Sequence, residues 1–503
     1  MRGGAGGSRS TAGGSARVTA AALIGLGLLV TAAAPAAAAE PGEPAGLLSP
    51  RRVDAVKAGI AVAGTVLVGL GALRRRRNPS AAPSRAEDAA LLSLGLAGAL
   101  CWWNLLAFHY PGYAHPRDNF HYYLGSKYFP ELGYERLYAC AAVADAEAGL
   151  RGPGSGGRIR DLGSNTLVPA RATLDRPARC KGHFSAERWE AFSRDVAFMR
   201  GRLPAAKWRT IFSDHGYNAT PAWGLIGGVL TNSAPLGRGQ LRALTAIDPL
   251  LLAAMWGAVV WAFGWRVACI GSIFWGTNYF AGYGWTGGGI LRQDWLAATV
   301  IGLCLLRREQ RFAAGFALGW AALLRVFPGF LLVALALAEG ASMLASRRLH
   351  VSAPRRRIAA GALLALAIGV PLSGVVMGRS DSAGGTGPGL LVWLDFANNS
   401  RIHLTTPLQN HMGLQTLLSF DPDQTARKLR DITQTDAYAD WKRARVETLR
   451  DRYPLYVLAV IGFAAWLAVV GREREDWVVA SLGIGLVPIA SELTNYYYAV
   501  LLG

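Results

Sequence analysis

The sequence alternates between long uncharged apolar runs and short segments rich in arginine, from residue 58 almost to its end. A helix needs about 20 apolar residues to cross the hydrocarbon core of a bilayer, and runs of this kind are typical of membrane spans. The composition agrees, since 52% of the 503 residues are hydrophobic and 17% are charged. This balance excludes a disordered chain and disfavours an ordinary soluble enzyme. We therefore predict a polytopic all-α membrane protein.

The basic residues fit an orientation signal better than a nucleic-acid surface. The chain has 52 Lys and Arg against 33 Asp and Glu, which gives a net charge of +19. Such an excess raises the question of nucleic acid. Many of the arginines, however, stand directly beside the apolar runs, where positive charge sets membrane orientation. We expect no nucleic-acid partner.

We predict about 10–11 transmembrane helices from these runs. The candidate spans are 18–39, 58–73, 89–108, 249–264, 267–283, 295–306, 312–324, 328–345, 358–377, 455–470 and 477–497. Several of them are shorter than a bilayer requires. Short helices of this kind must be tilted, broken or packed around a cavity inside the protein.

The N-terminal run has two interpretations. Arg2, Arg9 and Arg17 precede the apolar run, and Ala37-Ala38-Ala39 resembles a signal-peptidase site. Residues 1–39 are therefore either a cleaved signal peptide, which we favour, or a retained first helix.

Alternating the spans places the short arginine-rich loops on a single side. These loops are 74–85, 307–311, 347–357 and 472–474, and the positive-inside rule makes that side cytoplasmic. We expect a multi-pass protein of the bacterial inner (cell) membrane with its large loops extracytoplasmic. The resulting divisions are 1–39, 40–108 with N-terminal helices, 109–247 as a large outer loop, 248–377 as a transmembrane core, 378–453 as a second outer segment, and 454–503 with C-terminal helices.

The loop 109–247 is too long to be without structure. It contains a helix-like stretch at 135–150, a Gly/Pro/Arg-rich linker at 151–161, and amphipathic stretches that begin at Ser185 and at Pro204. We expect these amphipathic helices to lie along the membrane surface. Cys140 and Cys180 are the only cysteines in the predicted outer segments. An oxidising compartment would join them in a disulfide, and the alternative is two separate buried thiols.

Two polar features interrupt the predicted spans. Arg325 lies at the tip of a short helical hairpin, next to Phe327-Pro328. There it either binds the phosphate of a lipid carrier or snorkels to the interface. Glu492, Asn495 and the tyrosines 496–498 form a polar, aromatic end to the last predicted helix. They belong either to a substrate cavity or to an interfacial aromatic belt, and we favour the belt.

The densest polar region directly follows Phe108 and contains Asp118 and His121. These two residues are three apart, so on a helix they share a face. Two ligands without a third at diagnostic spacing only weakly support a divalent metal, and we predict no metal site. We expect a structural hydrogen bond from His121 rather than metal ligation. The glycine-rich stretches lack the lysine and the strand–helix context of nucleotide-binding loops.

These features together resemble the GT-C superfamily of membrane glycosyltransferases, which use polyprenyl-phosphate sugars. The resemblance rests on the large loop after an early helix, the Asp beyond that helix, short broken helices and the Phe-Pro hairpin. Residues 118–138 (DNFHYYLGSKYFPELGYERLY), 214–223 (DHGYNATPAW) and 396–418 are similar to segments of uncharacterised bacterial members. The likeness runs from about Ala89 to the C-terminus. The chain departs from the family in one respect, because Asp118 stands alone where many members have paired acids. It ends at Gly503, directly after the last predicted span, and one alternative is that later helices are missing.

The resemblance implies transfer of a sugar, with inversion, from a polyprenyl-phosphate donor to a glycan, lipid or protein acceptor on the extracytoplasmic side. Asp118 would be the general base, and Arg325 would bind the donor phosphate. Second-rank candidates for sugar or acceptor contacts are His121, Asp214, Tyr217, Asn218, His403 and Asn410. For Asp214 the alternative is a role in the turn that ends at Gly216, and for Asn410 a role in satisfying loop backbone groups.

A transporter or flippase without transferase activity is the competing hypothesis, because polar residues and short helices within the membrane also fit a carrier. The two large outer segments are excessive for a carrier, and no inverted repeat is visible between the halves. A non-catalytic membrane scaffold is a third possibility.

Overall fold

The computed structural model describes residues 50–106, 108–109, 112–150, 152–153, 157–278, 282–377 and 389–502. The predicted signal peptide or first helix, 1–39, lies outside these residues. The described chain is mostly helical, with two small two-stranded antiparallel sheets. It forms two compact units: one contains residues up to 108 together with 259–287, and the other contains most of the remaining chain. Each unit is described by itself.

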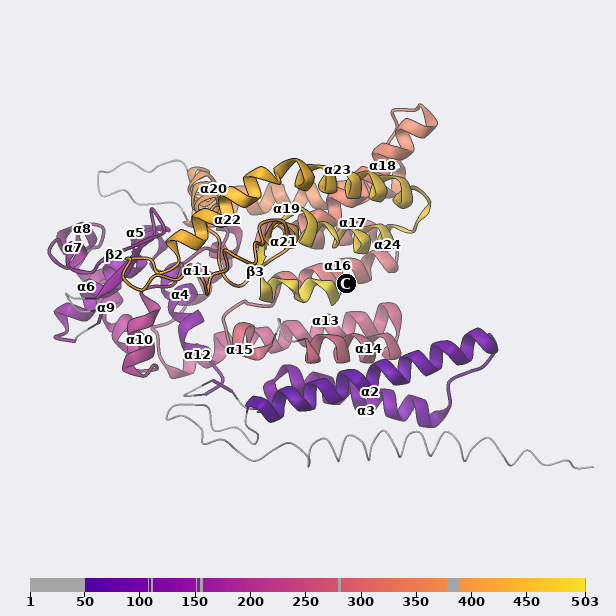
Figure 1. The fold of residues 1–503 in the computed structure, drawn as a ribbon, viewed down its shortest axis with the longest axis horizontal. Coiled ribbons are helices and arrows are strands. Elements are labelled where there is room, and N and C mark those ends of the chain that lie inside the picture. Colours follow the sequence, from indigo (N-terminus) through magenta and orange to yellow (C-terminus); the bar gives the residue numbers. More distant parts are fainter. Residues whose placement is uncertain are drawn as a thin grey trace, which may run out of the picture. The chain divides into compact units, whose positions relative to one another are not determined.

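The first unit is a small helical bundle (Figure 1). Its elements are α2 (Pro50–Arg77), α3 (Arg85–Trp102), η1 (Asn104–Leu106), α14 (Trp265–Thr277) and α15 (Tyr283–Thr286). Gly95 and Gly98 allow α14 to approach α3 closely, because a Cβ at either position would lie 2.8 Å from atoms of Cys269 or Ile273. Cys101 and Cys269 are buried free thiols in this core.

The second unit begins with the segment that follows Phe108. Its first elements are α4 (Pro116–Lys127), α5 (Phe129–Leu132), α6 (Leu137–Glu147), β1 (Arg158–Asp161), β2 (Thr166–Pro169), α7 (Arg171–Leu174), α8 (Ala178–Lys181), α9 (Ala186–Arg200), α10 (Ala205–Ile211), α11 (Pro221–Asn232) and α12 (Arg238–Thr245). Strands β1 and β2 form a hairpin in which Arg158 faces Pro169 and Asp161 faces Thr166. The turn between them has Asn165 in the left-handed region, at φ +56°.

The second unit continues with apolar helices and with the described part of segment 378–453, which we call the second folded segment. Its further elements are α16 (Asp294–Arg307), α17 (Arg311–Leu324), α18 (Gly329–Ser346), α19 (Ala353–Met377), α20 (Leu391–Leu404), β3 (His411–Met412), α21 (Leu414–Leu418), α22 (Ala439–Asp451), α23 (Tyr453–Val470), η2 (Gly471–Glu473), α24 (Asp476–Gly483), α25 (Leu486–Ala490), β4 (Leu493–Thr494) and η3 (Asn495–Leu502). Helix α13 (Ile247–Phe263) contributes residues to both units. Helix α17 packs between α16 and α19, and β3 pairs with β4.

Five of the described helices are long and apolar enough to cross a membrane. They occupy Arg51–Arg77, Arg238–Phe263, Gly329–Ser346, Ala353–Met377 and Tyr453–Glu473, and Arg311–Leu324 and Asp476–Ala490 are shorter apolar helices. Large apolar side chains on these helices are exposed, including Leu458 and Ile461 on α23 at 68% and 60%. Exposed apolar faces of this kind are typical of surfaces that contact lipid or another protein. The fold is therefore compatible with an all-α membrane protein with five candidate spans, while the larger number of spans and their orientation stay predictions.

Two predicted spans differ in the structure. The run 89–108 stops being α-helical at Trp102, because Asn104, Leu105 and Leu106 have positive φ angles. The run 477–497 is not a continuous helix, and this prediction is wrong. It breaks into α24, α25, β4 and η3, with Gly485 between the first two and extended backbone at Ser491.

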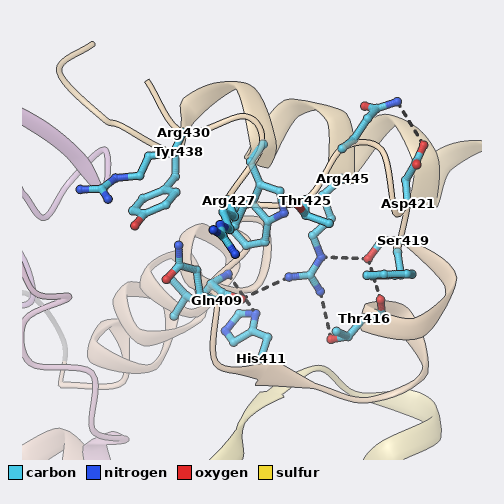
Figure 2. Close-up of a pocket in the computed structure, with 15 residues that line it drawn as sticks. Gln409, His411, Thr416, Ser419, Asp421, Thr425, Arg427, Arg430, Tyr438 and Arg445 are labelled. Carbon is cyan, nitrogen blue, oxygen red and sulfur yellow. Dashed lines mark hydrogen bonds between the residues drawn. The ribbon is translucent and has the colours of Figure 1, made fainter. Parts of the chain in front are cut away.

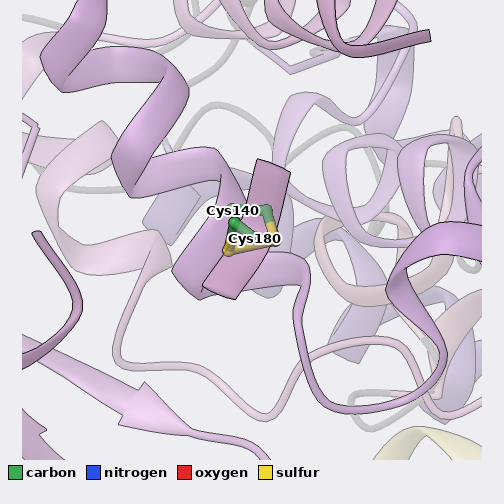
Figure 3. Close-up of a disulfide and its surroundings, with 2 residues drawn as sticks. All are labelled: Cys140 and Cys180. Atoms are coloured by element: carbon green, nitrogen blue, oxygen red, sulfur yellow. A yellow bond between two sulfur atoms is a disulfide. The ribbon is translucent and has the colours of Figure 1, made fainter. Parts of the chain in front are cut away.

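The amphipathic helices of segment 109–247 are close to those predicted. Ser185 caps α9 by accepting a hydrogen bond from the Arg188 N–H, and α10 begins directly after Pro204. The predicted stretch 135–150 corresponds to α6. The apolar faces of these helices bury Phe192, Trp208 and other aromatic side chains within the segment. A disulfide joins Cys140 of α6 to Cys180 of α8, the pair that the sequence singled out (Figure 3).

Candidate active site

The first turn of α4 holds Asp118 in a fixed position. His115 caps this helix, since its Nδ1 accepts a hydrogen bond from the Asp118 N–H at 3.1 Å, and Pro116 occupies the first helical position. Proline suits that position because its fixed φ is helical and its missing N–H is not needed there. The local sequence His115-Pro116 thus begins a helix that presents Asp118 one turn before Tyr122.

The Asp118 carboxylate is nearly buried and incompletely bonded. Its side chain is 12% exposed, and Oδ1 lies 3.8 Å from Nη1 of Arg292. Within the described part of the chain, its Oδ2 is buried without a hydrogen-bond partner. A Cβ added at Gly289 would lie 2.4 Å from Oδ2, so only glycine leaves room for the carboxylate. A buried carboxylate oxygen without a donor is costly and needs an explanation, of which a catalytic role is one.

Arg292 is held next to Asp118 by its own backbone. It lies just before α16, where the Arg292 N–H donates to both carboxylate oxygens of Asp248 at 3.0 Å, and the Gln293 N–H donates to Oδ1 at 3.2 Å. The Arg292 guanidinium is 6% exposed and faces two tyrosine rings, at 5.3 Å from the Tyr122 centroid and 4.8 Å from that of Tyr496. Asp248 therefore fixes the segment from which this arginine projects.

Arg325 supplies a second buried cation. Its backbone leaves α17 in an extended conformation, and Nη1 donates to the Leu324 carbonyl at 2.9 Å. The residue is 7% exposed, and Nε and Nη2 are buried without hydrogen-bond partners among the described residues. A snorkelling arginine would reach solvent, so the burial contradicts that alternative. The guanidinium carbon lies 6.0 Å from the Tyr122 ring centroid, so Tyr122 is shared by both arginines.

Tyr122 also connects this group of residues to Asn218. Its hydroxyl donates to Oδ1 of Asn218 at 2.7 Å. Burial raises the pKa of Tyr122 well above its usual value. Its hydroxyl therefore stays protonated at physiological pH and can donate a hydrogen bond. We call Asp118, Tyr122, Arg292 and Arg325 the Asp118 cluster. It combines one carboxylate oxygen available to accept a proton with two cations that retain unused donors.

The segment around Asp214 forms a separate network. Arg117 Nε donates to Asp214 Oδ2 at 2.8 Å, and His121 Nε2 lies 2.7 Å from the Tyr138 hydroxyl and 4.0 Å from Asp214. Burial opposes ionisation of Asp214, but the positive charges of His121 and Arg117 outweigh burial and lower its pKa to about 2. Burial lowers the pKa of His121. Its contact with Tyr138 is the structural hydrogen bond that we expected.

The other residues predicted to contact the sugar or acceptor lie in several parts of the second unit. Tyr217 is fully buried and stacks on Tyr134 with centroids 5.9 Å apart, so it packs within segment 109–247. The His403 ring lies 6.0 Å from that of His215, and burial lowers the pKa of His403 to about 4. The Asn410 backbone carbonyl accepts from the Asn495 N–H at 2.9 Å, a bond that does not involve the side chain, so the role of that side chain stays a prediction. Of the second-rank residues, both Asn218 and Tyr217 contact Tyr122 of the Asp118 cluster, Asn218 through its hydrogen bond and Tyr217 through a ring contact at 5.9 Å.

Sequence reasoning missed Arg292. Tyr496 and Tyr497 face Arg292, with Tyr497 at 5.9 Å, and Glu492 is an ion-pair partner of Arg445. These contacts fit the cavity alternative, and the interfacial belt that we favoured for this segment stays a prediction. An arginine at the start of an apolar helix was the available signal for Arg292, because such residues are rare in membrane proteins without a function.

No three His, Cys, Asp or Glu side chains cluster as a metal site within the ranges that the structure describes. Comparisons with family models, with curated proteins and with solved structures find no match to this chain. The Asp118 cluster is therefore the feature of the chain that points to a function.

Proposed function

We propose that this chain is a membrane glycosyltransferase of the GT-C type in a bacterial inner membrane. It transfers a sugar from a polyprenyl-phosphate donor to an acceptor hydroxyl on the extracytoplasmic side, with inversion. The observation that carries the proposal is the buried, unpartnered Oδ2 of Asp118 near Arg292, whose guanidinium shares the Tyr122 ring with that of Arg325. The donor is a substrate, and the mechanism uses side chains of this chain alone.

Asp118 is the general base in this mechanism. As the acceptor oxygen attacks the anomeric carbon, Oδ2 takes the proton from the acceptor hydroxyl. The new carbon–oxygen bond forms on one face of the sugar while the bond to phosphate breaks on the other. The electron pair of the broken bond remains on the lipid phosphate, and a single displacement of this kind inverts the anomeric configuration.

Arg292 and Arg325 stabilise the leaving phosphate. Its charge grows as the bond breaks, and fixed donors that need no reorganisation lower the barrier most effectively. Guanidinium groups suit this role because their planar donors match phosphate oxygens and remain charged when buried. Arg325 was the sequence candidate, and Arg292 joins it because both guanidinium groups adjoin Tyr122.

The test uses purified protein in nanodiscs with polyprenyl-phosphate mannose or glucose labelled in the sugar. Octyl glycosides serve as acceptors, and release of free sugar is followed in their absence. We expect Asp118→Asn to lower transfer by about 10²- to 10⁴-fold, the usual contribution of a general base. Asp423→Asn is the matched control, because it neutralises an exposed carboxylate in the second segment and should leave transfer unchanged.

Transfer that survives Asp118→Asn would remove Asp118 from the role of base. If neither donor is turned over, but the protein moves a labelled polyprenyl-phosphate sugar across a proteoliposome bilayer, the flippase alternative replaces the transferase.

A further inference from the structure

A cavity of about 460 Å³ lies within the second folded segment, and its lining residues include none of the Asp118 cluster (Figure 2). Its walls come from the chain after α20, from α21, from the loop before α22, and from α22 itself. The volume is within the range of about 300–1,000 Å³ that is usual for small-molecule sites. The cavity is therefore large enough for a ligand.

The floor of the cavity is a fixed polar network around Arg445. Its Nε donates to the Ser419 hydroxyl at 2.8 Å, Nη1 donates to the Leu408 carbonyl at 3.2 Å, and Nη2 donates to the Thr416 hydroxyl at 3.0 Å. Arg445 also forms an ion pair with Glu492, and both side chains are at most 9% exposed. The charge of Arg445 is thus already compensated, and its position is determined by four partners.

His411 adds no charge to this floor. Its Nδ1 accepts from the Leu408 N–H at 3.4 Å. Burial, followed by the positive charge of Arg445, lowers the pKa of His411 to about 4. His411 Nδ1 also lies 3.4 Å from Oε2 of Glu492, whose charge Arg445 already compensates, so burial and Arg445 decide its pKa and the floor offers mainly hydrogen-bonding groups.

The walls, in contrast, carry positive charge that is not compensated. Arg427 and Arg430 line the cavity and are exposed, and in the described chain neither forms an ion pair. Arg430 lies beside the Tyr438 ring, with its guanidinium carbon 5.9 Å from the centroid. Figure 2 shows Arg427 pointing toward the side where Gln409 and His411 lie. The lining carboxylate, Asp421, accepts from Gln424 and from the Asp423 N–H.

We propose that this cavity binds a carbohydrate that carries a carboxylate or phosphate group, as the acceptor of the proposed transferase. A pyranose ring has an apolar C–H face that stacks on aromatic rings, and Tyr438 and Trp441 both line the cavity. Its hydroxyl groups match the Gln409 amide and the neutral floor. Its anionic group would bind Arg427 and Arg430, whose guanidinium groups form charge-assisted, bidentate hydrogen bonds. The assignment to an acceptor rests on the proposed function, while the binding chemistry follows from the cavity.

The test measures equilibrium binding to the Asp118→Asn protein in phosphatidylcholine nanodiscs, so no turnover is required. The probes are trigalacturonate for a carboxylate, glucose 6-phosphate for a phosphate, and neutral maltotriose. We expect at least one anionic probe to bind and to weaken by about tenfold or more in the double variant Arg427→Gln/Arg430→Gln. Lys428→Gln is the matched control, because it removes a positive charge from the same loop without lining the cavity. Trp441→Ala should weaken anionic and neutral probes alike.

The proposal would be overturned if the anionic probes bound equally tightly to the proteins with and without the Arg427→Gln/Arg430→Gln substitutions. It would also be overturned if neither anionic probe bound. A second arm replaces phosphatidylcholine with phosphatidylglycerol. If the double variant changes only the response to this lipid, the cavity is a lipid headgroup site instead. Arginine-dependent probe binding without any sugar transfer would reject the transferase alone, and transfer without such binding would reject the cavity alone.

Discussion

The carboxylate of Asp248 is 1% exposed and receives hydrogen bonds from the backbone N–H groups of Arg292 and Gln293. These hydrogen bonds do not involve the Arg292 guanidinium, but they fix the backbone from which the Arg292 side chain projects. In the proposed mechanism it is a positioning residue. A carboxylate suits this role because it accepts from several donors at once, whereas an amide brings one acceptor and two donors.

We expect Asp248→Asn to lower kcat/KM for the donor by about tenfold or more, since an amide NH2 would replace Oδ2 and face the Arg292 N–H, donor against donor. Asp145→Asn is the matched control. Asp145 is also buried, where it pairs with Arg200 and accepts from the Trp208 indole N–H, so its loss should reduce thermal stability without changing kcat/KM. Equal losses of stability with equal losses of activity in both variants would show that Asp248 acts through folding alone.

Gly289 provides a second test at the scale of single residues. Gly289→Ala would place a methyl group 2.4 Å from Asp118 Oδ2, and the carboxylate must then move. We expect sugar transfer to fall by about a hundredfold, close to the effect of Asp118→Asn, while the protein still folds. Transfer is measured beside Gly239→Ala, whose added Cβ meets no atom within 4 Å. Full activity in Gly289→Ala would mean that the position of this carboxylate is unimportant.

The candidate site could be predicted from sequence only in part. Asp118 and Arg325 stand out because ionisable residues beside membrane helices require a reason. Arg292 carries the same signal, but its importance depends on Asp248 and Tyr496, which are distant in sequence. No periodic pattern records such contacts, so its place near Asp118 becomes visible only once the chain is folded.

At the scale of elements, local signals explain which helices were predicted well. Ser185 and Pro204 define the starts of α9 and α10 because capping and proline preferences depend on neighbouring residues alone. Hydropathy, in contrast, reports apolar content and not hydrogen bonding. It therefore joined α24, α25 and η3 into a single span, although Gly485 and the extended Ser491 interrupt the helix.

The disulfide between α6 and α8 should stabilise segment 109–247. It joins residues 40 positions apart, and closing a loop of that length stabilises the folded state by about 4 kcal/mol in the chain-entropy model. We expect reduction, or Cys140→Ser/Cys180→Ser, to accelerate proteolysis in residues 151–185. The double variant is also the control for the reductant, because it should no longer respond to it. Unchanged cleavage on reduction would show that packing alone holds α8.

The buried histidines of the second segment predict acid sensitivity. Burial lowers the pKa values of His403 and His411 to about 4, below the usual 6.5. The unfolded chain therefore binds protons between pH 6.5 and 4 that the folded chain does not, so stability is full above pH 6.5 and declines as pH falls to 4. Each histidine contributes at most about 1.4 kcal/mol per pH unit.

Thermal unfolding of the wild type should therefore shift to lower temperature between pH 7 and pH 4.5. The variant His403→Gln/His411→Gln should show a flatter dependence over the same window. Asp214 affects stability in a lower pH range, because its pKa of about 2 lies below the usual 3.8. Its contribution to folding stability is lost only as the pH falls below 3.8. A steep decline that persists in the histidine variant would assign the acid sensitivity to other groups.

At the scale of the whole molecule, ion pairs join three of the arginine-rich loops. Arg307 pairs with Glu475 at 3.2 Å, while Arg311 and Arg355 both pair with Asp476, at 3.4 and 3.3 Å. These loops therefore meet at one end of the helices of the second unit, around a cavity of about 630 Å³. The alternation of apolar spans places these loops on the same side, and from the positive-inside rule we predict that this end is cytoplasmic.

This orientation predicts which loops a membrane-impermeant maleimide reaches. Arg348→Cys lies in an exposed arginine-rich loop, and Ser164→Cys lies in the exposed turn of the β1–β2 hairpin. In spheroplasts we expect labelling of Ser164→Cys at once and of Arg348→Cys only after permeabilisation. The wild type is the control, since Cys101, Cys269 and Cys304 are buried and the other two cysteines form a disulfide. Because the proposed reaction needs Asp118 on the side of segment 109–247, labelling of both positions from the same side would contradict the topology and the extracytoplasmic reaction together.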